Sequence, residues 1–167
     1  MIDIRLDIVP PKHTGQGSLT ILGKAGGRQW VGKKTSSPAK QTQLMFANEF
    51  RKYKTPDCPL EGPVFCGIYY GYPYRKSERR AVVASSKGIW CDKKPDADNL
   101  DKLIWDAMSM PVRKQKPEYH AGIWQDDSQV AIHFFSKFYC KDPFVRIIVK
   151  PLDEYVEDFK IEELLNV

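Results

Sequence analysis

The chain has 167 residues, of which 42% are hydrophobic and 28% charged, values that are typical of one globular domain and argue against a disordered or fibrous chain. No apolar run approaches the roughly 20 residues of a membrane-spanning helix, and the first residues, MIDIRLDIVPP, lack the pattern of a signal peptide, so we expect a cytoplasmic protein with no membrane partner. The net charge of +5 is divided unevenly, because residues 1–95 carry +10 and residues 96–167 carry −5.

This division of charge suits a polyanion that lysines and arginines bind while carboxylates hold a metal ion. A solvated surface explains the charge equally well. The four cysteines lie far apart and form no CxxC pair, so we expect reduced structural thiols and no zinc finger.

The first elements are predicted from alternation and from helix-start residues. Residues 2–8 alternate isoleucine or leucine with charged residues, which predicts a half-buried strand. The glycine-rich, basic residues 12–34 predict two short strands or a ribbon around a Gly-Gly pair. A helix follows, in which Ser37 can cap the first amides and Pro38 fits the first turn. Its apolar face is predicted to consist of Phe46, Ala47, Phe50 and Tyr53.

The middle of the chain predicts a strand, a basic connection and a second helix. Residues 64–74 are rich in β-branched and aromatic residues, as strands are. Residues 75–95 form a long basic connection, and such connections are usually functional or mobile. The helix is predicted over residues 99–110, before Pro111. Its buried stripe consists of Leu100, Leu103, Ile104, Ala107 and Met108.

The last part predicts two strands and a terminal helix. SQVAIHFF and FVRIIVKPL are expected to form an antiparallel hairpin joined near KDP. In the first strand we expect Val130, Ile132 and Phe134 to face the core. The residues of opposite parity are Asp127, Gln129, Ala131 and His133. The acidic tail from about residue 153 predicts a helical extension. We therefore expect an α+β fold, one domain over residues 1–167, with a small mixed or antiparallel sheet and helices packed on one face.

The tryptophans and histidines of the chain are expected to have mainly structural roles. We expect Trp90, Trp105 and Trp124 to pack within the fold, in preference to stacking on bases. His120 and His133 are alternative metal ligands or proton carriers, but a lone histidine in a loop or strand is more often incidental.

Two acidic segments are the strongest candidates for chemistry. Asp96 and Asp98 precede the second helix, and Asp126 and Asp127 precede a strand. Two ionised carboxylates about 4 Å apart repel by roughly 4 kcal/mol at an effective dielectric near 20, so a close cluster implies Mg²⁺ or Mn²⁺, shared protons or a nearby lysine. We expect Asp127 to point away from the core and Asp126 to lean inward and accept structural hydrogen bonds.

A purely structural interpretation is also available. Asp98 is a plausible N-cap of the helix, and Asp98 with Lys102 forms an ordinary i, i+4 ion pair. Capping does not explain Asp96, however, nor the second acidic pair.

The segments KPDADNLDKLIWDAM and GIWQDDSQV together resemble the signature of the RusA family of Holliday junction resolvases, crossover junction endodeoxyribonucleases of bacteria and their phages. The resemblance implies a Mg²⁺-dependent hydrolase, for which Mn²⁺ can substitute, acting as a homodimer on four-way junctions in DNA recombination and repair. It also implies that Asp96, Asp98 and Asp127 are catalytic, metal-binding carboxylates and that Lys102 is the active-site lysine. Asp126 matches the other acid of the pair, which is less central to catalysis.

The chain departs from the family pattern in two places. Residues 111–121 are longer and more basic than the usual turn, and the tail beyond about Leu152 is additional. These departures leave the chemistry intact but put substrate preference and partners in doubt.

Basic residues flank the acidic segments and are expected to contact the DNA backbone. They are Arg75, Lys76, Arg79, Arg80, Lys93 and Lys94 in one stretch, and Arg113, Lys114 and Lys116 in the other. Either stretch could instead be a solvated loop. Two other functions remain open: a junction-binding recombination factor with little or no cleavage, and a nuclease for flaps, forks or other branched DNA.

Overall fold

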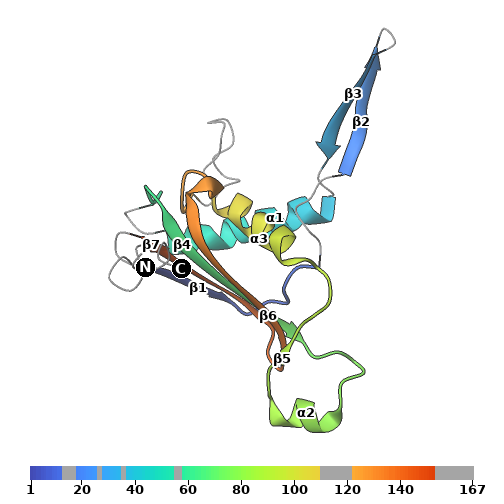
Figure 1. The fold of residues 1–167 in the computed structure, drawn as a ribbon, viewed down its shortest axis with the longest axis vertical. Coiled ribbons are helices and arrows are strands. Elements are labelled where there is room, and N and C mark those ends of the chain that lie inside the picture. Colours follow the sequence, from blue (N-terminus) through green and yellow to red (C-terminus); the bar gives the residue numbers. More distant parts are fainter. Residues whose placement is uncertain (13–17, 26–27, 35–36, 55–57, 110–121, 153–167) are drawn as a thin grey trace, which may run out of the picture.

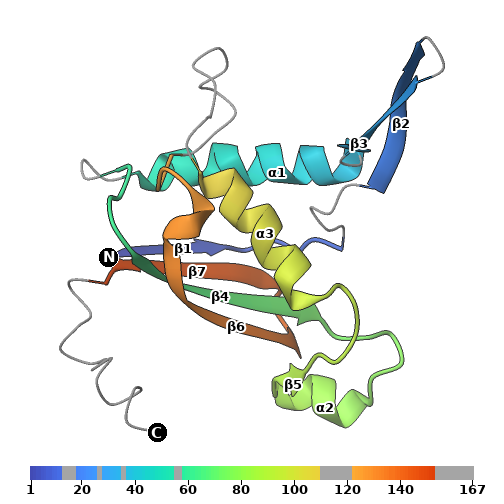
Figure 2. The same ribbon diagram turned by 45° about the horizontal axis from the view of Figure 1, so that its top comes forward.

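A five-stranded mixed sheet forms the centre of the computed structural model, which describes residues 1–12, 18–25, 28–34, 37–54, 58–109 and 122–152. The strands lie in the order β1-β7-β4-β6-β5, and the long helices α1 and α3 cover one face of the sheet (Figure 1; Figure 2). This arrangement confirms the predicted α+β fold. Among the described residues, no helix is long and apolar enough to cross a membrane.

The elements follow the sequence patterns closely in most places. The sheet consists of β1 (Ile2–Leu6), β4 (Val64–Pro73), β5 (Ile89–Trp90), β6 (Val130–Cys140) and β7 (Phe144–Pro151). The helices are α1 (Ser37–Phe50), α2 (Arg80–Ser85) and α3 (Ala97–Met108). The predicted ribbon is confirmed as the antiparallel pair β2 (Ser18–Ala25) and β3 (Arg28–Lys34), which stands away from the sheet (Figure 1). The predicted C-terminal helix lies outside the described residues.

The core lies between the sheet and the two long helices. Ile4, Ile68 and Ile147 from three neighbouring strands are fully buried, as are Phe46 and Phe50 of α1. The predicted stripe of α3 is buried in full. Tyr53 is an exception to the predicted face of α1, because it is 36% exposed in a 3-10 turn that follows the helix.

The predicted hairpin of β6 and β7 is wrong, because β4 lies between them. β4 pairs parallel with β6 and antiparallel with β7. The strand is apolar on both faces, which suits a central position. Gly71 makes room where the neighbouring strands pass it, since a Cβ there would lie 2.8 Å from both the Cys140 Sγ and the Phe144 Cδ1.

The predicted parity of β6 is also wrong beyond its first residues. Val130 pairs with Val64, but Ile132 pairs with Phe65, so the register shifts by one residue. An extra residue reverses the alternation of side chains along a strand. As a result, His133 contacts α3 on the core side, and Phe134 is 47% exposed.

The basic connection contains α2 and β5, neither of which was predicted. β5 pairs with the end of β6 and forms one edge of the sheet. Its Trp90 is 79% exposed, so the expectation that this tryptophan packs in the fold is wrong. Trp124 is fully buried and Trp105 is partly buried, as expected.

Candidate active site

The first acidic segment leads directly into α3. The helix begins at Ala97, so Asp96 is the N-cap residue and Asp98 lies in the first turn. The predicted capping by Asp98 is therefore wrong. The Asp96 side chain makes no capping hydrogen bond either. Both carboxylates are favoured at the positive end of the helix dipole, but the structure shows no capping hydrogen bond that holds the Asp96 side chain in place.

The second acidic segment is a 3-10 turn, Asp127–Gln129, that opens into β6. Asp126 caps it by accepting a hydrogen bond from the Ser128 amide at 2.9 Å. Gln129 completes a reciprocal capping box by accepting from the Asp126 amide at 3.1 Å. The structural role predicted for Asp126 is confirmed, although the residue is exposed and does not lean inward. Hydrogen bonds from the Ser128 side chain and, to a smaller extent, from its amide lower the pKa of the Asp126 carboxyl.

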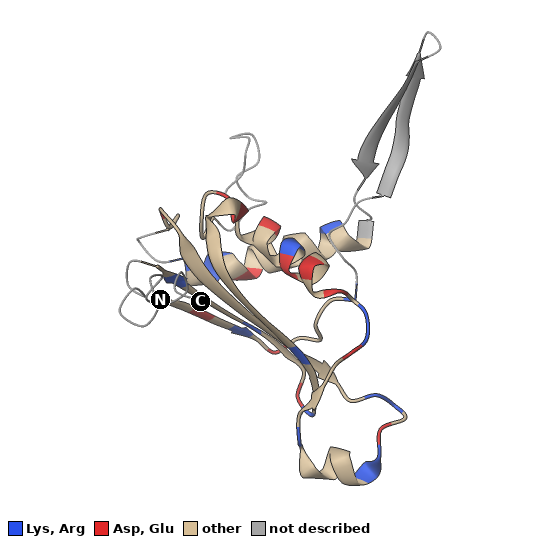
Figure 3. Cartoon of the chain, in the orientation of Figure 1, with Lys and Arg blue, Asp and Glu red and all other residues tan. Residues whose placement is uncertain are grey.

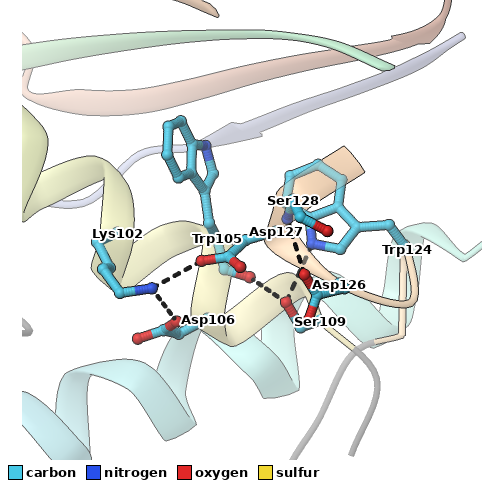
Figure 4. A network of polar contacts seen from close by, with 8 residues as sticks. All are labelled: Lys102, Trp105, Asp106, Ser109, Trp124, Asp126, Asp127 and Ser128. Atoms are coloured by element: carbon cyan, nitrogen blue, oxygen red, sulfur yellow. Dashed lines mark hydrogen bonds and ion pairs between the residues drawn. The ribbon is translucent and has the colours of Figure 1, made fainter. Parts of the chain in front are cut away.

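Lys102 joins α3 to the second acidic segment (Figure 4). Its Nζ lies 2.7 Å from the Oδ2 of Asp127 and 3.1 Å from the Oδ1 of Asp106. The i, i+4 pair of this lysine is therefore with Asp106, and the predicted pair with Asp98 is wrong. The hydrogen bond to Asp127 raises the pKa of Lys102, with a smaller contribution from Asp106, so the lysine remains a cation. Asp127 is thereby held against α3 beside Lys102, and Lys102 itself lies one helical turn beyond Asp98.

A buried scaffold fixes the turn that carries Asp127 to the end of α3. The Trp124 indole is fully buried and donates to the Ser109 hydroxyl at 3.1 Å, and that hydroxyl donates to the Trp105 carbonyl (Figure 4). The Ile123 amide donates to the Met108 carbonyl at 2.8 Å. Ile123 and Trp124, the IW of the segment GIWQDDSQV, therefore anchor the turn that carries Asp127.

Asp101 is a buried carboxylate that sequence reasoning missed. Its Oδ1 accepts a hydrogen bond from the Tyr70 hydroxyl at 2.8 Å, and its Oδ2 lies 2.6 Å from the Nε2 of His133. The second contact is close but poorly aligned, so Oδ2 lacks a well-formed hydrogen bond within the described residues. The available signal was an acidic residue within the apolar stripe of α3. A carboxylate that is buried requires a polar partner. Asp101 thereby ties α3 to β4 and β6.

Lys137 is a second residue that was missed, and it fixes the approach to Asp96. Its ammonium group donates to the carbonyls of Lys93 and Pro95, the latter at 2.8 Å. The Cys91 amide also donates to the Lys137 carbonyl at 3.0 Å. The residue directly before Asp96 is therefore held by β6, the strand that the Asp127 turn opens. A lysine close to the aromatic residues of this strand, in FFSKFY, was the available signal.

The first basic stretch lies on the loops around α2, and α3 carries acidic residues (Figure 3). Lys76, Arg79, Arg80 and Lys94 are exposed. Arg75 is paired with Glu78 at 3.0 Å, and Lys93 with Asp92 at 3.4 Å. The second stretch, with Arg113, Lys114 and Lys116, lies outside the described residues.

Asp96, Asp98 and Asp127 are the candidate donors for a metal ion. Within the described part of the chain, no three His, Cys, Asp or Glu side chains are placed so that they could hold one ion together. The chemistry of Asp96, Asp98 and Asp127 nevertheless fits Mg²⁺, because hard oxygen donors suit that cation. Asp96 and Asp98 are exposed and make no hydrogen bond to a described side chain, so their rotamers are free to change.

Residues 10–150 match the family described as Endodeoxyribonuclease RusA. This chain belongs to the RusA family. The match covers both acidic segments and the strands and helices that carry them, so the RusA resemblance of the two motifs is confirmed. As a RusA-family protein the chain is a nuclease of the endodeoxyribonuclease class, whose members act on branched DNA. No curated protein matches the chain.

Proposed function

We propose that this RusA-family chain is a Mg²⁺-dependent crossover junction endodeoxyribonuclease that resolves Holliday junctions in DNA recombination and repair. The observation that carries the proposal is the ion pair of Lys102 and Asp127, which brings the second acidic segment to the helix that begins at the first. DNA suits this chain because exposed cations on α2 and its flanking loops lead into the start of α3. They are Lys76, Arg79, Arg80 and Lys94, and we call this segment the basic arm.

In this proposal Asp96, Asp98 and Asp127 are the metal ligands. Bound Mg²⁺, or Mn²⁺ in its place, would supply an activated water and neutralise charge on the scissile phosphate. The three carboxylates reach a common ion only if exposed side chains rotate and Asp127 exchanges part of its contact with Lys102. Asp126 stays in its capping role and takes no direct part.

Lys102 has two roles in the proposal. Without DNA its ammonium group offsets repulsion among the carboxylates, as its contacts with Asp127 and Asp106 support. With DNA bound, the same cation is placed to contact a phosphate oxygen, where negative charge develops during hydrolysis.

The basic arm around α2 is proposed to bind the DNA backbone. Exposed lysines and arginines contact phosphates without reading bases, so binding would weaken steeply as salt is added. Resolution requires two symmetric incisions, and we propose a two-fold homodimer in the bacterial or phage-infected cytoplasm. Sedimentation of the full chain tests the dimer.

The deciding experiment compares DNA substrates and one variant. Wild type and Asp98→Asn are incubated with a mobile four-way junction, a replication fork, a flap and a linear duplex, in Mg²⁺ and in EDTA. We expect paired incisions in the four-way junction, only in wild type and only with Mg²⁺. Faster cleavage of forks or flaps would show that the chain acts on another branched substrate. Tight junction binding without cleavage would show that it is a recombination factor.

A further inference from the structure

A cavity of about 460 Å³ lies beside the acidic site. It is formed where the end of β4, the loop that precedes α3 and the end of β6 meet. Its lining residues are Lys12, Tyr72, Pro73, Tyr74, Arg75, Lys76, Cys91, Lys94, Pro95 and Tyr139. The volume falls within the roughly 300–1,000 Å³ of typical small-ligand pockets. Because Lys94 and Pro95 directly precede Asp96, a ligand in the cavity would lie next to the proposed cleavage site.

The cavity is strongly cationic. Within the described residues Lys12, Lys76 and Lys94 make no ion pair, whereas Arg75 is paired with Glu78 and lies near the Asp92 carboxylate, which itself pairs with Lys93. Several like charges around one cavity repel each other, and a bound anion relieves that repulsion. The cavity therefore favours a group such as phosphate.

Tyr74 is the partly exposed aromatic wall of the cavity, because Tyr72 and Tyr139 are only 6% and 8% exposed and the Arg75 guanidinium lies over the Tyr139 ring. The Tyr72 hydroxyl donates to the Pro11 carbonyl at 3.0 Å, and the Tyr74 hydroxyl to the Lys87 carbonyl at 2.7 Å. Burial raises the pKa of Tyr72, and a hydrogen bond with Cys91 raises the pKa of Tyr139 to about 12. These phenols stay neutral at physiological pH and do not cancel the positive charge. Aromatic rings beside cations are the combination that binds unstacked nucleotides.

We propose that this cavity receives one unstacked nucleotide of the DNA strand, adjacent to the phosphodiester that is cut. Its phosphate contacts the lysines, and its base lies against Tyr74. The inference rests on the proposed nuclease function and deepens it, because it gives a reason to prefer branched DNA: bases leave the stack more readily at a branch point than within a duplex.

The test is a scan with single abasic sites. Four-way junctions carry one abasic nucleotide at each position from three before to three after the cleaved bond, and the full chain is assayed for binding and single-turnover cleavage. We expect one position at which the lost base weakens binding by about tenfold in wild type. Lys76→Ala combined with Lys94→Ala should bind the intact junction more weakly and lose this dependence on position.

The controls separate the cavity from general effects. Both substituted lysines are exposed, so the variant should fold. Lys40→Ala combined with Lys54→Ala, at exposed positions on and just after α1, removes the same two charges and is the matched control. If every abasic position affects wild type and the double variant equally while cleavage persists, the nucleotide cavity is wrong and the nuclease function stands. If wild type neither binds nor cuts any branched DNA, both proposals are wrong.

Discussion

The Nζ of Lys102 lies 2.7 Å from the Oδ2 of Asp127, although 25 residues separate them in the chain. This contact links α3 to the turn that opens β6. The same strand contacts α3 again through His133 and Asp101, and holds the approach to α3 through Lys137 and Pro95. β6 is therefore the element that aligns the two acidic segments.

Asp127 and Asp126 are neighbours with different partners, so they can be separated by matched substitutions. Asp127→Asn should lower the cleavage rate by at least about a hundredfold, since losing even an outer partner of a metal ligand typically costs roughly 10–100-fold. Asp126→Asn keeps a capping side chain and should retain most activity. Single-turnover cleavage of a four-way junction measures both. Equal losses of cleavage rate in the two variants would contradict a metal-binding role for Asp127 and a capping role for Asp126.

Lys102 can be tested against its other partner, Asp106. Lys102→Met should slow cleavage by about a hundredfold, as loss of one charge-stabilising donor does elsewhere, and Asp106→Asn should have little effect. Since its partners raise the pKa of Lys102 above the ordinary 10.5, its ion pairs are fully present below 10.5 and are lost only as pH rises through the raised value. Full cleavage by Lys102→Met at neutral pH would exclude the catalytic role.

Lys137 is expected to position Asp96 through the Pro95 carbonyl. Lys137→Met should lower kcat by about tenfold and raise the Mg²⁺ concentration needed for half-maximal rate, with little change in KM for DNA. Lys137→Arg keeps the charge and donors, and should recover part of the rate. A rise in KM alone would indicate that Lys137 binds DNA.

Gly71 is predicted to be required for the passage of β6 and β7 on either side of β4. In Gly71→Ala the new Cβ would lie 2.8 Å from the Cys140 Sγ, so the free energy of unfolding should fall by about 1–3 kcal/mol. Gly88→Ala is the control, because its Cβ would meet only the Phe138 ring at 3.8 Å. Urea unfolding measures both, and a stable Gly71→Ala would show that the strands can shift.

Tyr70 satisfies one oxygen of the buried Asp101. Tyr70→Phe leaves that oxygen without its donor and should reduce the free energy of unfolding by about 1–3 kcal/mol. Tyr69→Phe, in the same strand but on the opposite face, should be nearly neutral. Equal effects in thermal or urea unfolding would mean that Asp101 finds another donor.

The strands and helices that depend on local pattern were predicted well. β1, β4, α1 and α3 follow from alternation, β-branched residues or a buried stripe, each of which is encoded within a few residues. The hydrogen-bonding role of Asp126 was also predictable, because a capping box needs only residues three apart. The prediction of which β6 side chains face the core was wrong, because a one-residue shift in register has no distinct sequence pattern.

By itself, the sequence determined the class of fold, the two acidic segments and the family to which they belong, because these features are local. Tertiary structure decided that β4 separates β6 from β7, that Lys102 pairs with Asp127 and Asp106, and that Lys137 holds the residue before Asp96. Those contacts join residues far apart in the chain. They depend on how the sheet and helices bury their apolar faces together, which local sequence patterns do not encode.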